Sequence, residues 1–405
     1  MDGSVQLEMR FGAANYAPMP VTLARGKGIY LWDENGRRYI DMMGAYSAAS
    51  FGHCHPRLVQ ALTDQARQLD TVSRAYFSDR LGAFLGRACA LTGMDQALPM
   101  NSGAEAVETA LKAARKWAYK VKEVPADRAE IIVCDGNFHG RTIAIVGFSS
   151  VQQYRDGFGP FPPGFRSVPF GDAAALRAAI TPNTAAFLVE PIQGEGGINV
   201  PPPGYLAEVA RICREHDVLL ICDEIQSGLG RTGKLLACQH DGVKPDAVTL
   251  GKALGGGLLP VSLFLARRDV MQVFKPGDHG STFGGNPVAA AVGLAALDTL
   301  IEEKLIERSA RLGAHLLSRL AAIRNPIIRE ARGRGLFVGV ELDRDLVSAA
   351  AVATRLLQAG VLTKDTHRNT VRFAPPLTIE ESEIDWAVDR VAEVLDEFAR
   401  ADVHP

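Results

Sequence analysis

Short apolar runs alternate with helical patterns along the middle of the chain, and this alternation constrains the fold more than any other feature. The runs predict buried strands at residues 131–133, 186–189, 218–221 and 247–250. Helix-like segments lie between several of them. Strands that alternate with helices are typical of a parallel sheet with helices on its faces. We therefore predict an α/β fold.

The chain has 405 residues, which corresponds to two or three domains at about 150 residues each. Asn286 and Pro287 form a helix-start signal before an alanine-rich helical run at 288–297. The pattern then changes to a β-like segment at 335–340, and Ile384, Val388, Val391, Leu395 and Phe398 recur at helical spacing in a last helix. We predict a second, smaller domain from about residue 303.

Charge, cysteine content and the N-terminus exclude several function classes. Lys+Arg 44 against Asp+Glu 46 leaves a net charge of -2, so the chain has no electrostatic footprint for nucleic acid or an anionic membrane. No stretch approaches the roughly 18 to 20 apolar residues that span a bilayer. The six cysteines form no C-x-x-C pair, and residues 1–4 do not resemble a signal or transit peptide. We expect a cytoplasmic protein with small-molecule partners.

Two local motifs suggest sites that their context does not support. Residues 228–233 match G-x-G-x-x-G, but the preceding strand does not lead directly into the glycines. With Lys234 the match nearly becomes a P-loop, yet Leu235 stands where that loop needs serine or threonine. The histidines at 53–55 lack a third clustered ligand, and Pro56 indicates a helix start. We predict no metal site.

Lys252 is set apart from the other lysines because it directly follows an apolar strand and enters a glycine-rich segment at 253–257. A lysine desolvated there has a depressed pKa and can act as a nucleophilic amine. Asp223 ends the preceding predicted strand, about one βα repeat upstream. An acid at a strand end is more often a cap or a solvated group, but both residues should lie at the ligand-binding carboxyl edge of one sheet. A Schiff-base lysine with a carboxylate for a pyridine nitrogen is the pattern of a pyridoxal-phosphate enzyme.

Such a cofactor needs a phosphate cradle, and Ser102, Gly103 and Ala104 provide one at the start of a predicted helix over 104–120. The first backbone N–H groups of a helix have no partner within the helix and favour an anion. Ser102 with Glu105 also matches a capping box. Capping and phosphate binding can hold together, because a helix start has several free donors.

Six motifs in the family's order resemble those of the class III aminotransferases, and the resemblance covers nearly the whole chain. These motifs are residues 101–106, 137–142, 189–195, 223–226, 250–253 and 279–287. Within the family the chain is most similar to members that transfer the terminal amine of ornithine. The segments that carry this closer resemblance are residues 15–16, 45–48, 52–56 and 371–376.

The resemblance implies a type I pyridoxal-phosphate fold with a large domain around a mostly parallel, seven-stranded sheet and a smaller α+β domain. It implies an N-terminal segment (1–46), a large cofactor-binding domain (47–302) and a small C-terminal domain (303–405). It also implies a homodimer, because residues of the neighbouring subunit complete the site.

The family pattern assigns roles around pyridoxal 5'-phosphate. Lys252 carries the cofactor, Asp223 pairs with its ring nitrogen, and together they are the catalytic pair. Phe138 stacks on the ring and Gln226 binds the ring hydroxyl. The phosphate is held by Gly103 and Ala104, and by Ser281 and Thr282 of the neighbouring subunit.

The resemblance also implies a substrate site for ornithine and 2-oxoglutarate. Arg141 clamps the α-carboxylate of ornithine, with Tyr16 near its α-amine and Tyr46 shaping the pocket. Arg372 lies closer to the cofactor, and Glu195 masks its charge until 2-oxoglutarate arrives. The planar fork of arginine matches a carboxylate in both places.

The substrate assignment has alternatives. His139 stands where animal members of the ornithine-specific branch carry tryptophan, and the F-H-G-R-T form also occurs in enzymes acting on N-acetylornithine. Tyr46 favours ornithine over N-acetylornithine or another ω-amino acid. A non-transferase pyridoxal-phosphate enzyme, a pyridoxal-phosphate-binding protein and, more remotely, a nucleotide-binding oxidoreductase based on 228–233 remain open.

Overall fold

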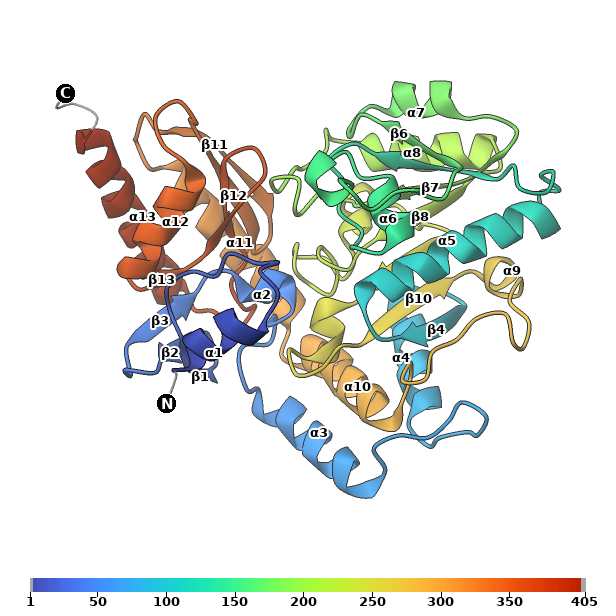
Figure 1. Cartoon of the computed structure of the whole chain (residues 1–405), viewed down its shortest axis with the longest axis horizontal. Helices are drawn as coiled ribbons and strands as arrows, with labels where there is room; N and C mark the ends of the chain where they lie inside the picture. The colour runs from blue at the N-terminus through green and yellow to red at the C-terminus, as the bar shows by residue number, and fades with distance from the viewer. Residues whose placement is uncertain (1–2, 402–405) are drawn as a thin grey trace.

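The computed structural model describes residues 3–401, so the outermost residues of the predicted N-terminal segment and C-terminal domain, 1–2 and 402–405, lie outside the described residues. A seven-stranded sheet forms the centre, in the order β4-β10-β9-β8-β7-β5-β6 (Figure 1). Its strands are β4 (Gln96–Met100), β5 (Glu130–Cys134), β6 (Phe165–Val168), β7 (Thr184–Val189), β8 (Leu219–Asp223), β9 (Ala247–Leu250) and β10 (Ser262–Ala266). Neighbours from β9 to β6 pair in parallel, whereas β10 runs antiparallel to both β9 and β4. The predicted mostly parallel α/β sheet is confirmed.

Side chains of each strand alternate between two cores on opposite faces of this sheet. In β8, Leu219 and Ile221 join one buried cluster and Leu220 and Cys222 join the other. The first cluster is covered by helix α5 (Gly103–Lys120), and the second by α8 (Tyr205–Glu215) and α10 (Pro287–Glu302). With apolar side chains on both faces, these strands appear in the sequence as continuous hydrophobic runs.

Two of the predicted helix starts have the expected caps. The Ser102 side chain accepts from the Glu105 N–H at the start of α5, and the Glu105 carboxylate accepts from the Ser102 N–H. The Asn286 side chain accepts from the Ala289 N–H at the start of α10, with Pro287 in the first helical position. These local hydrogen bonds satisfy backbone donors that have no partner within the helix.

Two smaller sheets lie on the other side of the molecule (Figure 1). One consists of β11 (Ile328–Arg334), β12 (Phe337–Leu342), β15 (Thr370–Phe373) and β14 (Lys364–Thr366), in that order. The other consists of β1 (Leu23–Lys27), β2 (Tyr30–Asp33), β3 (Arg38–Asp41) and β13 (Val361–Leu362). Because β13 pairs with β3, the N-terminal strands are joined to the C-terminal part of the chain. The domain boundaries at 46 and 302 stay predictions.

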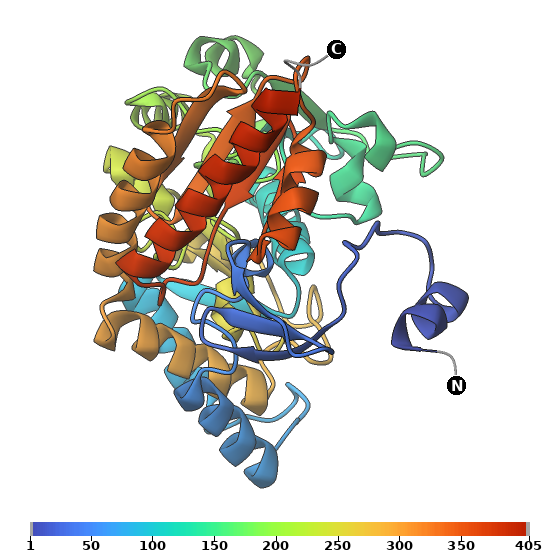
Figure 2. The ribbon, with the colours of Figure 1, turned by 90° about the vertical axis from the view of Figure 1, so that its left-hand side faces the viewer.

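Further helices cover the sheets and connect them. They are α1 (Ser4–Phe11), α2 (Gly44–Ser47), α3 (Pro56–Gln68), α4 (Leu81–Thr92), α6 (Ile143–Gly147), α7 (Ala173–Ala179), α9 (Arg268–Met271), α11 (Leu305–Ala321), α12 (Ala349–Gln358) and α13 (Glu381–Ala401), with 3-10 turns η1 (Gln152–Tyr154), η2 (Ala237–Asp241) and η3 (Lys252–Gly255). Helix α1 stands apart from the rest of the molecule (Figure 2) and buries no residue. Among residues 3–401, no helix combines the length and the apolar character needed to cross a membrane.

One sequence expectation needs correction, and one strand was not predicted. The predicted strand over 335–340 starts two residues too early, because Gly335 adopts φ +55 in the turn that joins β11 to β12. Strand β4 has no clear signal in the sequence because Pro99 interrupts it. Proline is tolerated in β4 because this strand lies at the edge of the sheet.

Candidate active site

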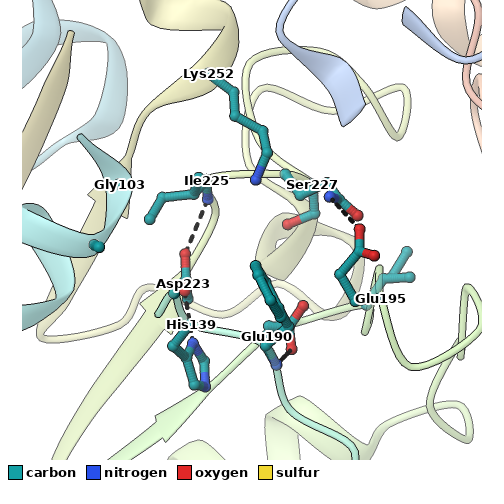
Figure 3. Close-up of a pocket in the computed structure, with 13 residues that line it drawn as sticks. Gly103, His139, Glu190, Glu195, Asp223, Ile225, Ser227 and Lys252 are labelled. Carbon is teal, nitrogen blue, oxygen red and sulfur yellow. Dashed lines mark hydrogen bonds and ion pairs between the residues drawn. The ribbon is translucent and has the colours of Figure 1, made fainter. Parts of the chain in front are cut away.

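A cavity of about 210 Å³ lies at the carboxyl ends of the central strands, with Asp223 and Lys252 in its wall. Asp223 is the last residue of β8 and is the register partner of Thr249 in the parallel strand β9. Lys252 follows β9 after one intervening glycine, and its side chain points into the pocket (Figure 3). The predicted meeting of these two residues at one sheet edge is confirmed.

Lys252 combines a strained backbone with a buried amine. Its φ of +46 lies in the left-handed region, which costs a residue other than glycine about 1–3 kcal/mol, and strained residues of this kind cluster at active sites. Burial lowers the pKa of Lys252, although the charges of Asp223 and Glu195 act in the opposite direction. A lowered pKa leaves more of the amine unprotonated, and the unprotonated amine is the nucleophile.

Asp223 is held by three hydrogen bonds inside the protein. Its Oδ1 accepts from the Thr249 hydroxyl at 2.9 Å and from the Ile225 N–H at 3.1 Å. Its Oδ2 lies 2.6 Å from Nδ1 of His139, whose side chain is fully buried. Burial alone would lower the pKa of His139, but the hydrogen bond and charge of Asp223 outweigh it and leave that pKa raised. The sequence analysis did not assign His139 to this pair.

The start of α5 forms one side of the cavity through Gly103 and Ala104. Gly140 packs against it so closely that a Cβ on Gly140 would lie 2.9 Å from the Cβ of Ala104. Gly140 also has a φ of +132, which favours glycine. Small residues on both segments leave the first N–H groups of α5 accessible to an anion.

Glu190 connects two loops that line the cavity. Its Oε1 accepts from the Phe138 N–H at 2.9 Å, and its Oε2 accepts from the Gly194 N–H at 3.1 Å. Burial raises the pKa of Glu190 to about 7. The sequence analysis missed this residue, although Glu190 directly follows β7, the neighbour of β8, and the sheet-edge argument that identified Asp223 applies to it equally.

Arg372 and Glu195 form a two-pronged ion pair, with Nη1–Oε1 and Nη2–Oε2 distances of 2.7 and 2.8 Å. Arg372 is buried, and its guanidinium carbon lies 4.8 Å from the ring centre of Tyr46. Burial alone would raise the pKa of Glu195, but the hydrogen bonds from Arg372 hold it at about 2. The positive charge of Arg372 is therefore neutralised at ordinary pH.

The loop that carries Glu195 is tied to the small sheet by residues that the sequence analysis missed. The Thr366 hydroxyl donates to the Glu195 carbonyl at 2.6 Å. The Arg332 guanidinium donates to the Gly197 carbonyl at 2.6 Å. These two hydrogen bonds fix the backbone of the loop at Glu195 and Gly197.

Not all predicted site residues reach the cavity wall. Phe138, Gln226 and Glu195 line the cavity, whereas Tyr16, Tyr46, Arg141, Ser281, Thr282 and Arg372 are outside its lining. Tyr16 is 79% exposed, and the Ser281 hydroxyl accepts from the Asn101 side chain at 2.7 Å. The roles assigned to all of these residues stay predictions.

The groups around the cavity fit pyridoxal phosphate. A buried amine, a carboxylate opposite it and a helix start match its aldehyde, ring nitrogen and phosphate. The Gln226 side chain donates to Glu195 at 3.2 Å, while its buried Oε1 has no hydrogen-bond partner among residues 3–401. That oxygen is free to accept a hydrogen bond from a ligand hydroxyl.

The two motifs set aside in the sequence have other structural roles. His53 lies 2.8 Å from Asp41 and His55 lies 3.2 Å from Glu303, and α3 begins at Pro56. Within the described part of the chain, no three His, Cys, Asp or Glu side chains are grouped so that they could hold a metal ion. Residues 228–233 form turns and do not lead into a helix.

Comparison with known proteins gives a consistent result. The family model "Aminotransferase class-III" matches residues 11–395. An ornithine aminotransferase of Geobacillus sp. (strain WCH70) is 55% identical over 391 residues, covering 96% of this chain and 98% of that protein.

Solved structures give the same relationship. The ornithine aminotransferase of Toxoplasma gondii, crystallised with partial occupancy of PLP at its active site, has a TM-score of 0.96 and 46% identity, covering 98% of this chain and 94% of that one. The acetylornithine aminotransferase of Elizabethkingia anophelis has a TM-score of 0.87 and 43% identity, covering 97% and 98%.

Proposed function

Because the chain belongs to the class-III aminotransferase family, we propose that it transfers the terminal amino group of L-ornithine to 2-oxoglutarate, with pyridoxal 5'-phosphate as its cofactor. The products are L-glutamate and glutamate 5-semialdehyde, which cyclises to pyrroline-5-carboxylate. The observation that carries this proposal is the contrast between two arginines. Arg372 is neutralised by Glu195, whereas Arg141 makes no ion pair or hydrogen bond within residues 3–401.

When bound, pyridoxal phosphate supplies an aldehyde that combines with amines and a ring that accepts an electron pair. Lys252 would hold the cofactor through its aldehyde, and Asp223 would keep the ring nitrogen protonated. Phe138 would pack on the ring, and Gln226 would bind the ring hydroxyl through its unpartnered Oε1. Gly103 and Ala104 hold the phosphate with their N–H groups.

Lys252 also moves the proton. With the cofactor bound and the substrate amine in place of Lys252, the free Nζ would act as general base and general acid toward the substrate carbon that bears the amine. The lowered pKa of Lys252 suits this exchange, because the amine must accept and release a proton near neutral pH. With 2-oxoglutarate as the acceptor, the same Nζ would serve as general acid and base in the opposite direction.

Charge placement selects the terminal amine of ornithine. Arg141 binds the α-carboxylate, Tyr16 lies near the α-amine, and Tyr46 shapes the pocket between them. If Arg372 were unmasked, it would bind that carboxylate near the cofactor and present the α-amine instead. The ion pair with Glu195 prevents Arg372 from binding the α-carboxylate of ornithine. When a dicarboxylate binds, Glu195 releases Arg372.

The assembly that we propose is a homodimer in the cytoplasm. Ser281 and Thr282 precede α10, and the adjacent Phe283 is 57% exposed. Tyr76 and Phe77 are exposed as well. Aromatic side chains of this kind are enriched in protein interfaces, and burying them against a second copy would bring Ser281 and Thr282 to the phosphate of the partner.

The proposed substrate is tested by assaying the purified, cofactor-loaded protein with 2-oxoglutarate and one amino donor at a time. The donors are ornithine, N-acetylornithine, 4-aminobutyrate and lysine. We expect the highest kcat/KM with ornithine and formation of pyrroline-5-carboxylate. A preference for N-acetylornithine would overturn the substrate and leave the chemistry intact, and this is the second candidate because an acetylornithine enzyme is 43% identical.

Replacing Glu195 with glutamine should shift selectivity toward glutamate. The amide cannot neutralise Arg372, so the guanidinium becomes available to α-carboxylates near the cofactor. We expect the ratio of glutamate to ornithine half-reaction rates to rise at least about tenfold, since a hydrogen bond between the freed guanidinium and a carboxylate is worth about 1.5–3 kcal/mol. Stopped-flow absorbance of each half-reaction measures the ratio. Glu330→Gln, which removes an exposed partner of Arg332, is the matched control and should leave the ratio unchanged.

A further inference from the structure

Arg141 is positioned by aromatic rings and not by acids. Its guanidinium carbon lies 3.9 Å from the ring centre of Tyr154 and 5.5 Å from that of Phe138. Both distances are within the roughly 6 Å over which a cation is attracted to the face of a ring. The Tyr154 contact is the shorter of the two.

This mode of attachment leaves the hydrogen-bond donors of Arg141 free. An arginine held by a carboxylate uses its N–H groups on that carboxylate, as Arg372 does with Glu195. A ring attracts the cation through its face and takes no N–H donor. Arg141 makes no hydrogen bond or ion pair with any residue from 3 to 401, so its planar fork remains available for a carboxylate from outside.

Tyr154 is itself fixed against the cofactor pocket. Its ring meets Phe138 edge-on, with ring centres 6.1 Å apart. On another side it meets His367, in the turn between β14 and β15, with ring centres 6.5 Å apart. The Phe138 backbone is anchored by Glu190. Tyr154 therefore sets the place of the guanidinium relative to both the pocket wall and the small sheet.

We propose that Tyr154 is a positioning and specificity-determining residue, which holds Arg141 so that it binds the carboxylate at the far end of the substrate. This inference rests on the proposed function, since it acts through the carboxylate-binding role of Arg141. It separates substrates into two classes. Substrates with a carboxylate distant from the reacting amine depend on the Tyr154 ring, and substrates without such a carboxylate do not.

The test compares ornithine with 1,4-diaminobutane, which has the same reacting amine and chain length but no carboxylate. In Tyr154→Leu, kcat/KM for ornithine should fall about tenfold, mainly through KM, because a cation–ring contact of this strength corresponds to about one power of ten. In the same variant, kcat/KM for 1,4-diaminobutane should stay within about twofold of the wild-type value. Tyr154→Phe keeps the ring and should behave as wild type, and Tyr154→Gln gives a second ring-free variant that suits a half-exposed position.

A double mutant tests whether Tyr154 acts through Arg141. In an Arg141→Ala background, Tyr154→Leu should cause no further change in the ornithine to diaminobutane ratio. The proposal would be overturned if Tyr154→Leu lowered kcat/KM equally for ornithine and 1,4-diaminobutane or left the ratio of the two values unchanged. It would also be overturned if Tyr154→Phe lost the preference for ornithine.

If the wild-type protein does not turn over ornithine, the proposed function is wrong, and this result is independent of the Tyr154 variants. The comparison is then made with N-acetylornithine and N-acetyl-1,4-diaminobutane, which differ by the same carboxylate. An unchanged ratio of these two substrates in Tyr154→Leu would overturn the role of Tyr154.

Discussion

Lys252→Ala is expected to abolish amino transfer, with a fall in kcat of at least about 10⁴-fold. In the proposed mechanism the substitution removes two functions at once, the covalent hold on the cofactor and the movement of the proton. No neighbouring side chain can replace the amine, because the other titratable groups in the cavity wall are His139 and the carboxyls of Glu190, Glu195 and Asp223. His139 is occupied by its 2.6 Å contact with Asp223.

Two measurements check this result. Turnover of ornithine should be undetectable above background, and the visible absorbance of cofactor bound through a lysine should be missing from the purified variant. Lys122→Ala is the matched control, because burial also lowers the pKa of Lys122, but its amine donates to the carbonyls of Thr184, His216 and Asp217. That control should lose stability and keep both the absorbance and the activity. Retention of more than about 1% of wild-type kcat by Lys252→Ala would contradict the assignment.

Asp223→Asn should lower the rate of both half-reactions by about 10³-fold. In the proposed mechanism the buried carboxylate supplies the negative charge that keeps the cofactor nitrogen protonated, and asparagine has no charge to replace it. The change also breaks the charged pair with the fully buried His139, and leaving one partner of such a pair alone costs about 3–5 kcal/mol. Because Lys252 is unchanged, the variant should still bind the cofactor.

The comparison variant is Thr249→Val, which removes the 2.9 Å hydrogen bond to Asp223 and leaves the charge in place. Its rate loss should be about tenfold or less, in line with a single hydrogen bond. Single-turnover absorbance with ornithine alone, and then with 2-oxoglutarate, separates the half-reactions. If Asp223→Asn stayed within tenfold of wild type, the carboxylate would not be the partner of the ring nitrogen.

Features of the fold that depend on neighbouring residues in the chain could be predicted well. The capping residues Ser102 and Asn286 act within a few residues of themselves, and their hydrogen bonds form where the sequence indicates. Strands buried on both faces were identified from their apolar runs. Strand β4 was missed because its edge position tolerates Pro99, and a sheet's order is not encoded in any one strand.

The features of the site also divide into those that local sequence predicts and those that depend on distant contacts. The adjacency of Asp223 and Lys252 follows from the geometry of a βα repeat, so periodicity alone placed them together. The pairing of Glu195 with Arg372 was available only from family resemblance, since 177 residues separate them and no local pattern connects them. His139, Arg332 and Tyr154 act through contacts with other segments of the chain and had no such signal, whereas the position of Glu190 directly after β7 was a signal that could have identified it.

By itself, then, the sequence determined the class of fold, the helix starts and the edge of the sheet at which the chemistry occurs, because short-range hydrogen bonds and hydrophobic periodicity depend on nearby residues. Only the tertiary structure decided which arginine is paired with an acid and which is free to bind a carboxylate. Whether an arginine is masked, as Arg372 is by Glu195, or held open, as Arg141 is by Tyr154, depends on which side chains the folded loops bring within a few ångströms.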